Sequence, residues 1–205
     1  MDSPELAESA APNSLSALIR RDLARHYGHD RLPPLWRAAL FKKTFTPVLT
    51  LRLYQHQVKK GGLLSSLLKP VLKILHRWAS ARLAIELPLG TKIGPGFRII
   101  HGFGLVINAK AEIGEDVTVF HGVTIGQRDR VRAEGRETRH SRIGDRVMLS
   151  PYAQVLGATV GDGATVAPLT VVYEDVAPRT VVGGNPPRVL KEEAQADVRY
   201  GMKTD

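Results

Sequence analysis

The sequence predicts a mainly-β protein, in which a parallel β-helix of hexapeptide repeats follows an α-helical N-terminal region. Aliphatic residues recur every six positions, with short adjustments near residues 105 and 160 and a break after residue 125: Leu87, Ile93, Ile99, Leu105, Ile107, Ile113, Val119, Ile125, Ile143, Leu149, Val155, Val160, Val166 and Val172. A period of six fits neither an α-helix nor an alternating strand. It is typical of a β-helix in which three six-residue units close each coil.

Two further regularities support the repeats. Glycine often follows the aliphatic residue directly, as at Gly94 and Gly144, where a corner needs backbone freedom. Small or β-branched residues stand four positions after most of the aliphatic ones: Thr91, Ala111, Val117, Val123, Val147, Ala153, Ala164 and Thr170. We expect the aliphatic residues to point inward and fill the coil.

The first 85 residues have helical periodicity instead. Residues 1–12 predict a disordered tail, and residues 13–85 a basic α-helical region. We expect three helices: one that Asn13 or Ser14 caps, one from Leu35 to about Lys59 that Pro47 should kink, and one after Gly61-Gly62. The third has a broad apolar face and a basic remainder, a pattern that suits packing on its own domain, on another subunit or on a membrane surface.

The whole net charge of +9 lies in the first 85 residues. Residues 1–85 hold 14 Lys and Arg against five Asp and Glu, whereas residues 86–205 hold 15 of each. Such a region suits a solvated helical surface or an anionic membrane surface. Nucleic-acid binding is not expected, because no aromatic side chains are interleaved with the charges for base stacking.

Composition excludes several classes of protein. The absence of cysteine excludes disulfides, thiolate zinc sites and cysteine nucleophiles. No apolar run reaches the ~18–20 residues of a membrane span, and the N-terminus lacks the basic start and apolar stretch of a signal peptide. We therefore expect a cytoplasmic protein, with peripheral contact at the inner membrane face as an option for its basic helices.

Three histidines of the repeat region are candidate functional residues. His101 and His121 each stand two residues after an inward aliphatic residue, and 20 residues separate them, one 18-residue coil plus a two-residue adjustment. Their rings should project from the same face of adjacent coils, about one strand spacing apart. His140 lies in the arginine-rich segment 127–142, which interrupts the repeats and predicts a protruding loop. The other four histidines (His26, His29, His56 and His76) carry no predicted role.

Four segments resemble the hexapeptide-repeat acyltransferases, in particular their serine acetyltransferase-like branch. They are IIHGFGLVI (99–107), IGEDVTVFHGVTIG (113–126), RHSRIGD (139–145) and VVGGNPPRVL (181–190). The resemblance implies that the β-helix over residues 86–191 is left-handed, with residues 192–205 as a C-terminal tail. It also implies a homotrimer with active sites between subunits, in which the N-terminal helices could pair two trimers.

The same resemblance implies an acetyl-CoA-dependent O-acetyltransferase that requires no metal. His101 would be the general base, and His140 would support the acceptor site across a subunit boundary. Acetyl transfer from a thioester to a hydroxyl needs a base that works near neutral pH, which suits imidazole. Without a cysteine or a G-x-S-x-G motif, direct attack is favoured over a covalent acyl-enzyme. His121 would tune His101 by stacking, or only fill a corner.

The acceptor contacts that we expect are Glu86, Asn108 and Arg139, the last of which suits a carboxylate. In serine acetyltransferases an aspartate precedes the catalytic histidine, and here that position is Ile100. Because the ammonium group of L-serine needs an anionic partner, this change favours a sugar hydroxyl. The expected acceptor is then a glycan of exopolysaccharide or capsule biosynthesis, or its lipid-linked precursor, as in colanic-acid-type O-acetyltransferases. The alternatives are a serine O-acetyltransferase and a non-enzymatic trimeric β-helix scaffold.

The donor site is expected toward the C-terminal coils, where the family binds coenzyme A between neighbouring β-helices. The matching positions are Gly126, Ser150, Pro151, Ala167 and Pro168, with Arg179 and Arg188 as candidate partners of the coenzyme phosphates.

Overall fold

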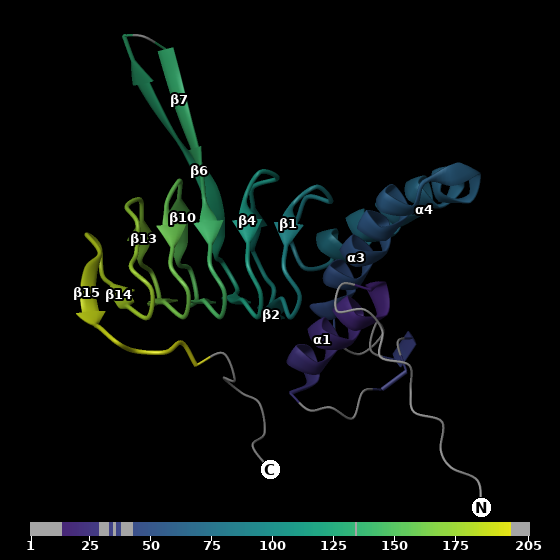
Figure 1. Cartoon of the computed structure of the whole chain (residues 1–205), viewed down its shortest axis with the longest axis horizontal. Coiled ribbons are helices and arrows are strands. Elements are labelled where there is room, and N and C mark those ends of the chain that lie inside the picture. Colours follow the sequence, from purple (N-terminus) through teal and green to yellow (C-terminus); the bar gives the residue numbers. More distant parts are fainter. Residues whose placement is uncertain (1–13, 29–32, 35, 38–42, 134, 198–205) are drawn as a thin grey trace, which may run out of the picture.

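A computed structural model describes residues 14–28, 33–34, 36–37, 43–133 and 135–197. Three α-helices, α1 (Leu15–Tyr27), α3 (Phe45–Lys60) and α4 (Gly62–Ala81), lie at one end of a β-helix, and the chain then winds away from them coil by coil (Figure 1). The expected tail 1–12 and residues 198–205 fall outside the described residues.

The β-helix is left-handed and has three sheets, which the chain visits in turn. Sheet 1 contains β1 (Lys92–Ile93), β4 (Glu112–Ile113), β8 (Arg142–Ile143) and β11 (Thr159–Val160). Sheet 2 contains β2 (Arg98–Ile100), β5 (Thr118–Phe120), β9 (Met148–Leu149), β12 (Thr165–Val166), β14 (Val181–Gly183) and the antiparallel β15 (Arg188–Lys191). Sheet 3 contains β3 (Val106–Ile107), β6 (Thr124–Arg132), β10 (Gln154–Leu156) and β13 (Val171–Val172).

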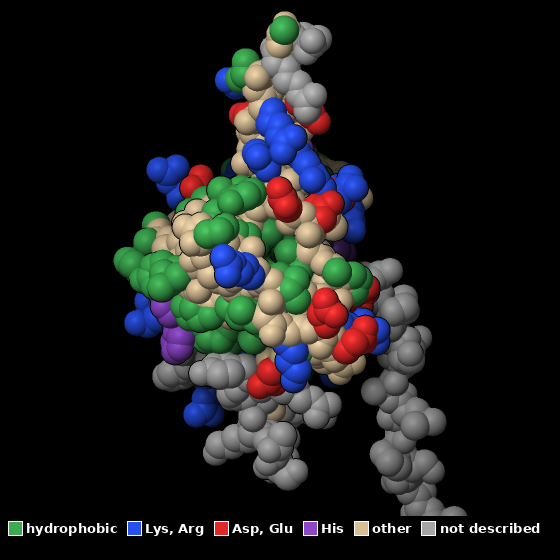
Figure 2. All heavy atoms as spheres, turned by 90° about the vertical axis from the view of Figure 1, so that its left-hand side faces the viewer, with side chains coloured by type: hydrophobic (Ala, Val, Ile, Leu, Met, Phe, Trp, Pro, Cys, Tyr) green, Lys and Arg blue, Asp and Glu red, His purple; other side chains and the backbone are tan. Residues whose placement is uncertain are grey.

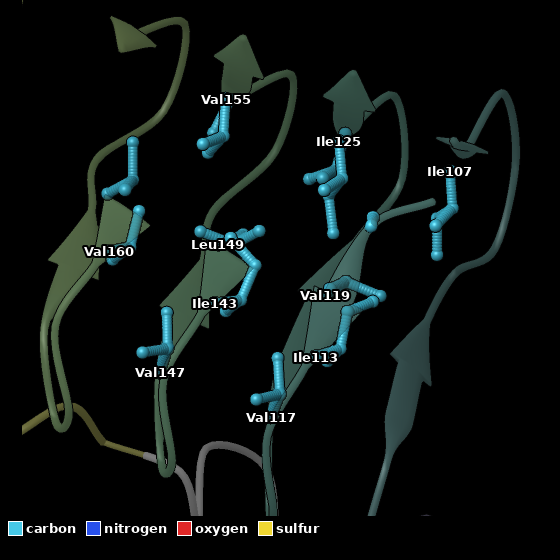
Figure 3. Close-up of a cluster of buried hydrophobic side chains, with 14 of the residues drawn as sticks. Ile107, Ile113, Val117, Val119, Ile125, Ile143, Val147, Leu149, Val155 and Val160 are labelled. Atoms are coloured by element: carbon cyan, nitrogen blue, oxygen red, sulfur yellow. The ribbon is translucent and has the colours of Figure 1, made fainter. Parts of the chain in front are cut away.

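The six-residue pattern forms the core, so the predicted fold class is confirmed. Every aliphatic repeat residue from Leu87 to Val172 is at most 9% exposed, and equivalent residues of successive coils pair in parallel register, as Ile113 pairs with Ile143. Their side chains stack inside the coil (Figure 3). Phe97 and Phe103 stand at two of the positions that small or β-branched residues fill in most repeats; Phe97 is buried and Phe103 is 64% exposed.

The segment expected to protrude as a loop contains an antiparallel hairpin. β6 continues past its coil to Arg132, and β7 (Gly135–His140) returns beside it with Gln127 opposite His140. The hairpin projects from the side of the β-helix (Figure 1). The side chains of β7 are exposed up to Arg139, so no buried apolar residues continue the six-residue period there, and backbone pairing joins the two strands.

The helices close the N-terminal end of the β-helix through a buried ion pair. Asp22 of α1 accepts hydrogen bonds from the Arg52 guanidinium of α3 and from the backbone N–H groups of Gly96 and Phe97. The Arg52 guanidinium also donates to the carbonyl of Ile93, at 2.6 Å. These bonds satisfy the carbonyl of Ile93 and the N–H groups of Gly96 and Phe97, for which the first coil has no preceding coil.

Pro47 does not kink a helix, which corrects the sequence expectation. The helix begins at Phe45, so Pro47 lies in its first turn, where a missing N–H costs no hydrogen bond. Residues 35 and 38–42, which the predicted helix included, lie outside the described residues.

Candidate active site at the corners of the β-helix

His101 and His121 lie next to each other at the corner that joins sheet 2 to sheet 3. Ile99 pairs with Val119, so the two histidines, each two residues later, stand on neighbouring coils. Their ring centroids are 5.8 Å apart in an edge-to-face arrangement. His101 is exposed and has a left-handed backbone with φ of 63°. That conformation is uncommon for a residue other than glycine, and here it turns the ring outward at the corner.

Tyr152 completes an aromatic stack on this corner. Its ring centroid is 5.1 Å from that of His121, again edge to face, and its N–H donates to the His121 carbonyl. The ring lies directly over Gly122, and a Cβ there would overlap it. The Nδ1 of His121 is buried with no hydrogen-bond partner among the described residues, and the ring packs between those of His101 and Tyr152.

Four of the predicted donor-site residues continue the same corner toward the C-terminus. The register of β5, β9 and β12 places Ser150 and Ala167 in line with Phe120, and Pro151 and Pro168 in line with His121. The two candidate histidines and these four donor candidates therefore form one column along a single edge of the β-helix, which we call the catalytic edge: His101, His121, Ser150, Pro151, Ala167 and Pro168.

The remaining donor candidates do not join this column. Gly126 of β6 pairs with Leu156 of β10, on the side of sheet 3 away from the catalytic edge. Arg179 lies on the corner between sheets 1 and 2, where it pairs with Glu193 at 2.7 Å. Arg188 is exposed on β15, opposite Gly183 of β14. Of the predicted donor residues, only Ser150, Pro151, Ala167 and Pro168 therefore line the catalytic edge of their own chain.

His140 stands at a different corner, at the foot of the hairpin between sheets 3 and 1. It is half-buried, and its Nδ1 is buried without a hydrogen-bond partner among the described residues. The next residue, Ser141, is fully buried, and its hydroxyl bonds the carbonyls of Gly126 and Val155 and the N–H of Gly157. Ser141 thus fixes the foot of the hairpin to two coils and sets the position of His140.

Arg139 is already paired within its own chain. Its Nη2 contacts both carboxylate oxygens of Asp175, at 2.6 and 2.7 Å. This contact, together with the N–H of Thr159, holds the pKa of the Asp175 carboxyl below its usual range. Arg139 borders a cavity of about 110 Å³, together with Arg128, Arg130, Glu137, Gly157 and Tyr173. Figure 2 shows Lys and Arg side chains gathered at the foot of the hairpin.

The two other expected acceptor residues lie on sheet 3. Glu86 is exposed and forms an isolated parallel β-bridge with Val106 of β3, so it lies one coil before that strand. The Asn108 amide donates to Gln127, and its oxygen accepts the N–H of Lys110 in a local turn. Asn108 therefore has a structural role at the hairpin in this chain.

Sequence reasoning missed Tyr152, Ser141 and Asp175. Tyr152 has a signal in the sequence, because it occupies the corner position that Gly122 fills one coil earlier, and a bulky residue there must project outward. Ser141 and Asp175 carry no such signal, since their roles depend on how the hairpin attaches to the coils.

Two of the histidines without a predicted role are buried structural groups. The His26 Nδ1 contacts the carbonyl of Asp22, and the His76 Nε2 donates to the carbonyl of Leu87 at 2.6 Å. Burial lowers the pKa of His76, so the neutral form is favoured. Among the described residues, no group of three or more His, Asp or Glu side chains is arranged to hold a metal ion.

Comparison with known proteins gives consistent relatives. No protein-family model matches the chain. The serine acetyltransferase of Bacillus licheniformis is 42% identical over 112 residues, which are 54% of this chain and 50% of that protein. The matched segments span between 36% and 62% of the length of these curated relatives.

Solved structures extend the similarity to the helices. Soybean serine acetyltransferase is 30% identical with a TM-score of 0.68, covering 89% of this chain and 71% of that one. The Brucella abortus serine acetyltransferase in complex with coenzyme A is 26% identical with a TM-score of 0.69, covering 88% and 69%.

These findings correct the expected acceptor class. The prediction of a sugar acceptor, and with it exopolysaccharide or capsule biosynthesis, is wrong, because the similar proteins are serine acetyltransferases. The prediction rested on one side chain, Ile100, which stands beside Phe120 on the neighbouring strand. A single apolar position does not outweigh similarity along the whole β-helix. The chain belongs to the hexapeptide-repeat acyltransferases of the serine acetyltransferase type.

Proposed function

We propose that this protein is a serine O-acetyltransferase, which transfers the acetyl group of acetyl-CoA to the hydroxyl of L-serine. The observation that carries the proposal is the exposed His101 on the catalytic edge, in a chain of this family. Two solved structures support the two substrates: a soybean serine acetyltransferase complexed with serine and the Brucella enzyme complexed with coenzyme A.

His101 acts as the general base. One imidazole nitrogen takes the proton of the serine hydroxyl while the serine oxygen attacks the thioester carbonyl carbon. The tetrahedral intermediate then collapses, the C–S bond breaks, and the proton passes from His101 to the departing coenzyme A sulfur. No covalent enzyme intermediate forms. The His121 ring packs edge to face with the His101 ring and fixes the orientation of the imidazole.

The acceptor site combines two subunits of a homotrimer. His101 and His140 lie at opposite ends of sheet 3 within one chain, so His140 and Arg139 reach His101 only from a neighbouring copy. Arg139 binds the serine carboxylate with the guanidinium donors that Asp175 leaves free. Glu86 supplies the anionic partner for the ammonium group, in place of the acid that Ile100 replaces.

The donor lies along the C-terminal part of the catalytic edge. Ser150, Pro151, Ala167 and Pro168 have short side chains. An extended pantetheine chain can therefore lie along these positions toward His101. Arg188 on β15 is the candidate contact for a coenzyme phosphate from the C-terminal end.

Detection of O-acetyl-L-serine, the expected product, tests the proposal. Purified protein is incubated with acetyl-CoA and L-serine, and O-acetyl-L-serine is measured by mass spectrometry, with L-alanine as the acceptor that lacks the hydroxyl. Formation of O-acetyl-L-serine, and no product with L-alanine, is expected. Glu86→Gln should raise KM for L-serine several-fold, while the exposed control Glu112→Gln leaves it unchanged. Absence of O-acetyl-L-serine despite acetyl-CoA binding would reject the acceptor.

A further inference from the structure

Helix α4 presents a long apolar face to solvent. Eight large hydrophobic side chains of this helix are exposed: Leu63 (81%), Leu64 (64%), Leu67 (63%), Leu68 (36%), Val71 (52%), Ile74 (69%), Leu75 (46%) and Trp78 (57%). The opposite side of the helix is already used, since Ser65, His76, Ala79 and Ser80 are buried. Packing within the chain therefore accounts for only one face, and an exposed patch of this kind marks an interaction surface.

A row of positive charges borders that face. Lys69, Lys73 and Arg77 follow at four-residue intervals, which places them along one side of the helix between its apolar and buried faces. The Arg82 guanidinium lies over the Trp78 ring, 4.4 Å from its centroid. The sequence from residue 31 to residue 85 contains no Asp or Glu. The face is therefore bordered by one sign of charge only.

We propose that α4 docks this protein on an anionic membrane surface, with the helix lying in the plane of the interface. An apolar face with lysines and arginines beside it is the pattern of interfacial helices, whose leucines and tryptophan enter the acyl boundary while the basic side chains meet lipid phosphates. Among the described residues, no helix has the length and apolar content to span a bilayer. Helix α4 lies at the end of the molecule away from β15, so it can meet a flat surface (Figure 1).

A two-fold contact between the α4 faces of two copies fits this face less well. A symmetric contact of two α4 faces would bring two basic rows together, with no acidic side chain between residues 31 and 85 to pair with them. Lipid phosphates supply the missing negative charge. Each Lys or Arg near an anionic surface adds about 1 kcal/mol of attraction, a contribution that salt screens.

Trp78 provides the direct test. The chain has two tryptophans, so Trp36→Phe leaves Trp78 as the only reporter. With vesicles of phosphatidylcholine and phosphatidylglycerol, we expect co-flotation, a blue shift of Trp78 emission and quenching by brominated acyl chains. Vesicles of phosphatidylcholine alone should bind far more weakly, and added salt should weaken binding to the mixed vesicles.

Paired variants separate the apolar and the electrostatic parts. Leu67→Ser with Ile74→Ser should abolish flotation, whereas Val131→Ser, at a hairpin side chain that is 77% exposed, should leave it unchanged. Lys69→Gln with Arg77→Gln should weaken binding to anionic vesicles roughly 30-fold. Lys110→Gln with Lys191→Gln, two exposed lysines of the β-helix, is the matched charge control.

Failure of the wild-type protein to float with anionic vesicles would overturn the proposal. A change in oligomeric mass of Leu67→Ser with Ile74→Ser, measured by light scattering without lipid, would assign the face to contact between copies instead. Acetyl transfer in free solution is expected to be the same for these variants and the wild type, so membrane docking and the proposed enzyme activity are tested separately.

Discussion

The edge-to-face stack of His101, His121 and Tyr152 depends on the size of the neighbouring side chains as well as on the imidazole rings. His101 has the exposed ring and the left-handed backbone, while His121 and Tyr152 support it from the next two coils. Gly122 permits this arrangement because the Tyr152 ring occupies the space that a side chain would need. Support of this kind fixes the orientation of the proposed base.

Gly122→Ala tests that support. The new methyl group must displace the Tyr152 ring, and the positive φ of 67° adds backbone strain, so His121 loses its partner. We expect kcat for acetyl transfer to fall at least about tenfold, with a smaller change in KM for acetyl-CoA. Gly135→Ala, at the hairpin turn where nothing lies within 4 Å, is the control for backbone strain and should retain activity. Equal loss in both variants would contradict the role of the stack.

Residue-scale prediction from sequence succeeded where the six-residue period constrains position. The spacing from Ile99 to His101 and from Val119 to His121 is enough to place both rings at one corner. It could not show that Arg139 contacts Asp175, because those side chains meet only when the hairpin foot packs against a later coil. It also could not identify the acceptor class, since Ile100 alone does not define a binding site.

At the scale of elements, the buried Asp22–Arg52 pair joins α1 and α3 to the first coil. Both side chains are at most 3% exposed, and the carboxylate is matched by four donors. Removing one partner from such a pair leaves an uncompensated buried charge. The helices therefore protect the open end of the β-helix, where the first coil has no neighbour.

Asp22→Ala should cost about 3–5 kcal/mol of unfolding free energy. Urea unfolding followed by circular dichroism measures it. The double variant with Arg52→Met should recover part of the loss, because the unpaired guanidinium is then gone. Glu112→Ala, whose ion pairs are exposed, is the control and should change stability far less. A loss for Asp22→Ala no larger than that of the control would contradict this role of the ion pair.

His76 should give the helical region a pH-dependent stability. Burial lowers its folded-state pKa, so below about pH 6.5 the unfolded state takes up a proton before the folded state does. Stability should therefore be unaffected by this group above that pH and fall as the pH drops toward the folded-state pKa. His76→Gln should reduce the difference in urea midpoint between pH 7.5 and pH 5.5, relative to His56→Gln. An unchanged difference would argue against the assignment.

Some element boundaries could be predicted from the sequence, and others could not. Buried aliphatic repeats fix each strand of the coils, so those were predictable. The hairpin β6–β7 was not, because its polar residues carry no periodic apolar signal, although its position between two repeats was evident. Pro47 predicted a kink only because the expected helix began ten residues too early.

At the scale of the whole molecule, the proposed active site requires more than one copy. His101 and His140 are held at different corners of the same rigid β-helix, and no motion of a side chain brings them together. Only neighbouring copies arranged around an axis can place one beside the other.

Subunit complementation tests this arrangement. His101→Ala and His140→Ala should each be inactive alone. When the two variants are co-expressed and assemble at random, about a quarter of the sites between subunits receive both histidines, and activity should return to roughly that fraction of wild type. If mixed oligomers form and remain inactive, the two histidines do not belong to one shared site.

The central claim is that His101 is the base that activates serine. The most direct measurement is thiol release from acetyl-CoA in the presence of L-serine, compared for the wild type and His101→Ala, with coenzyme A binding measured by calorimetry on both. We predict that His101→Ala loses at least about 100-fold in kcat while its affinity for coenzyme A stays within about twofold. Turnover of His101→Ala at the wild-type rate would contradict the mechanism.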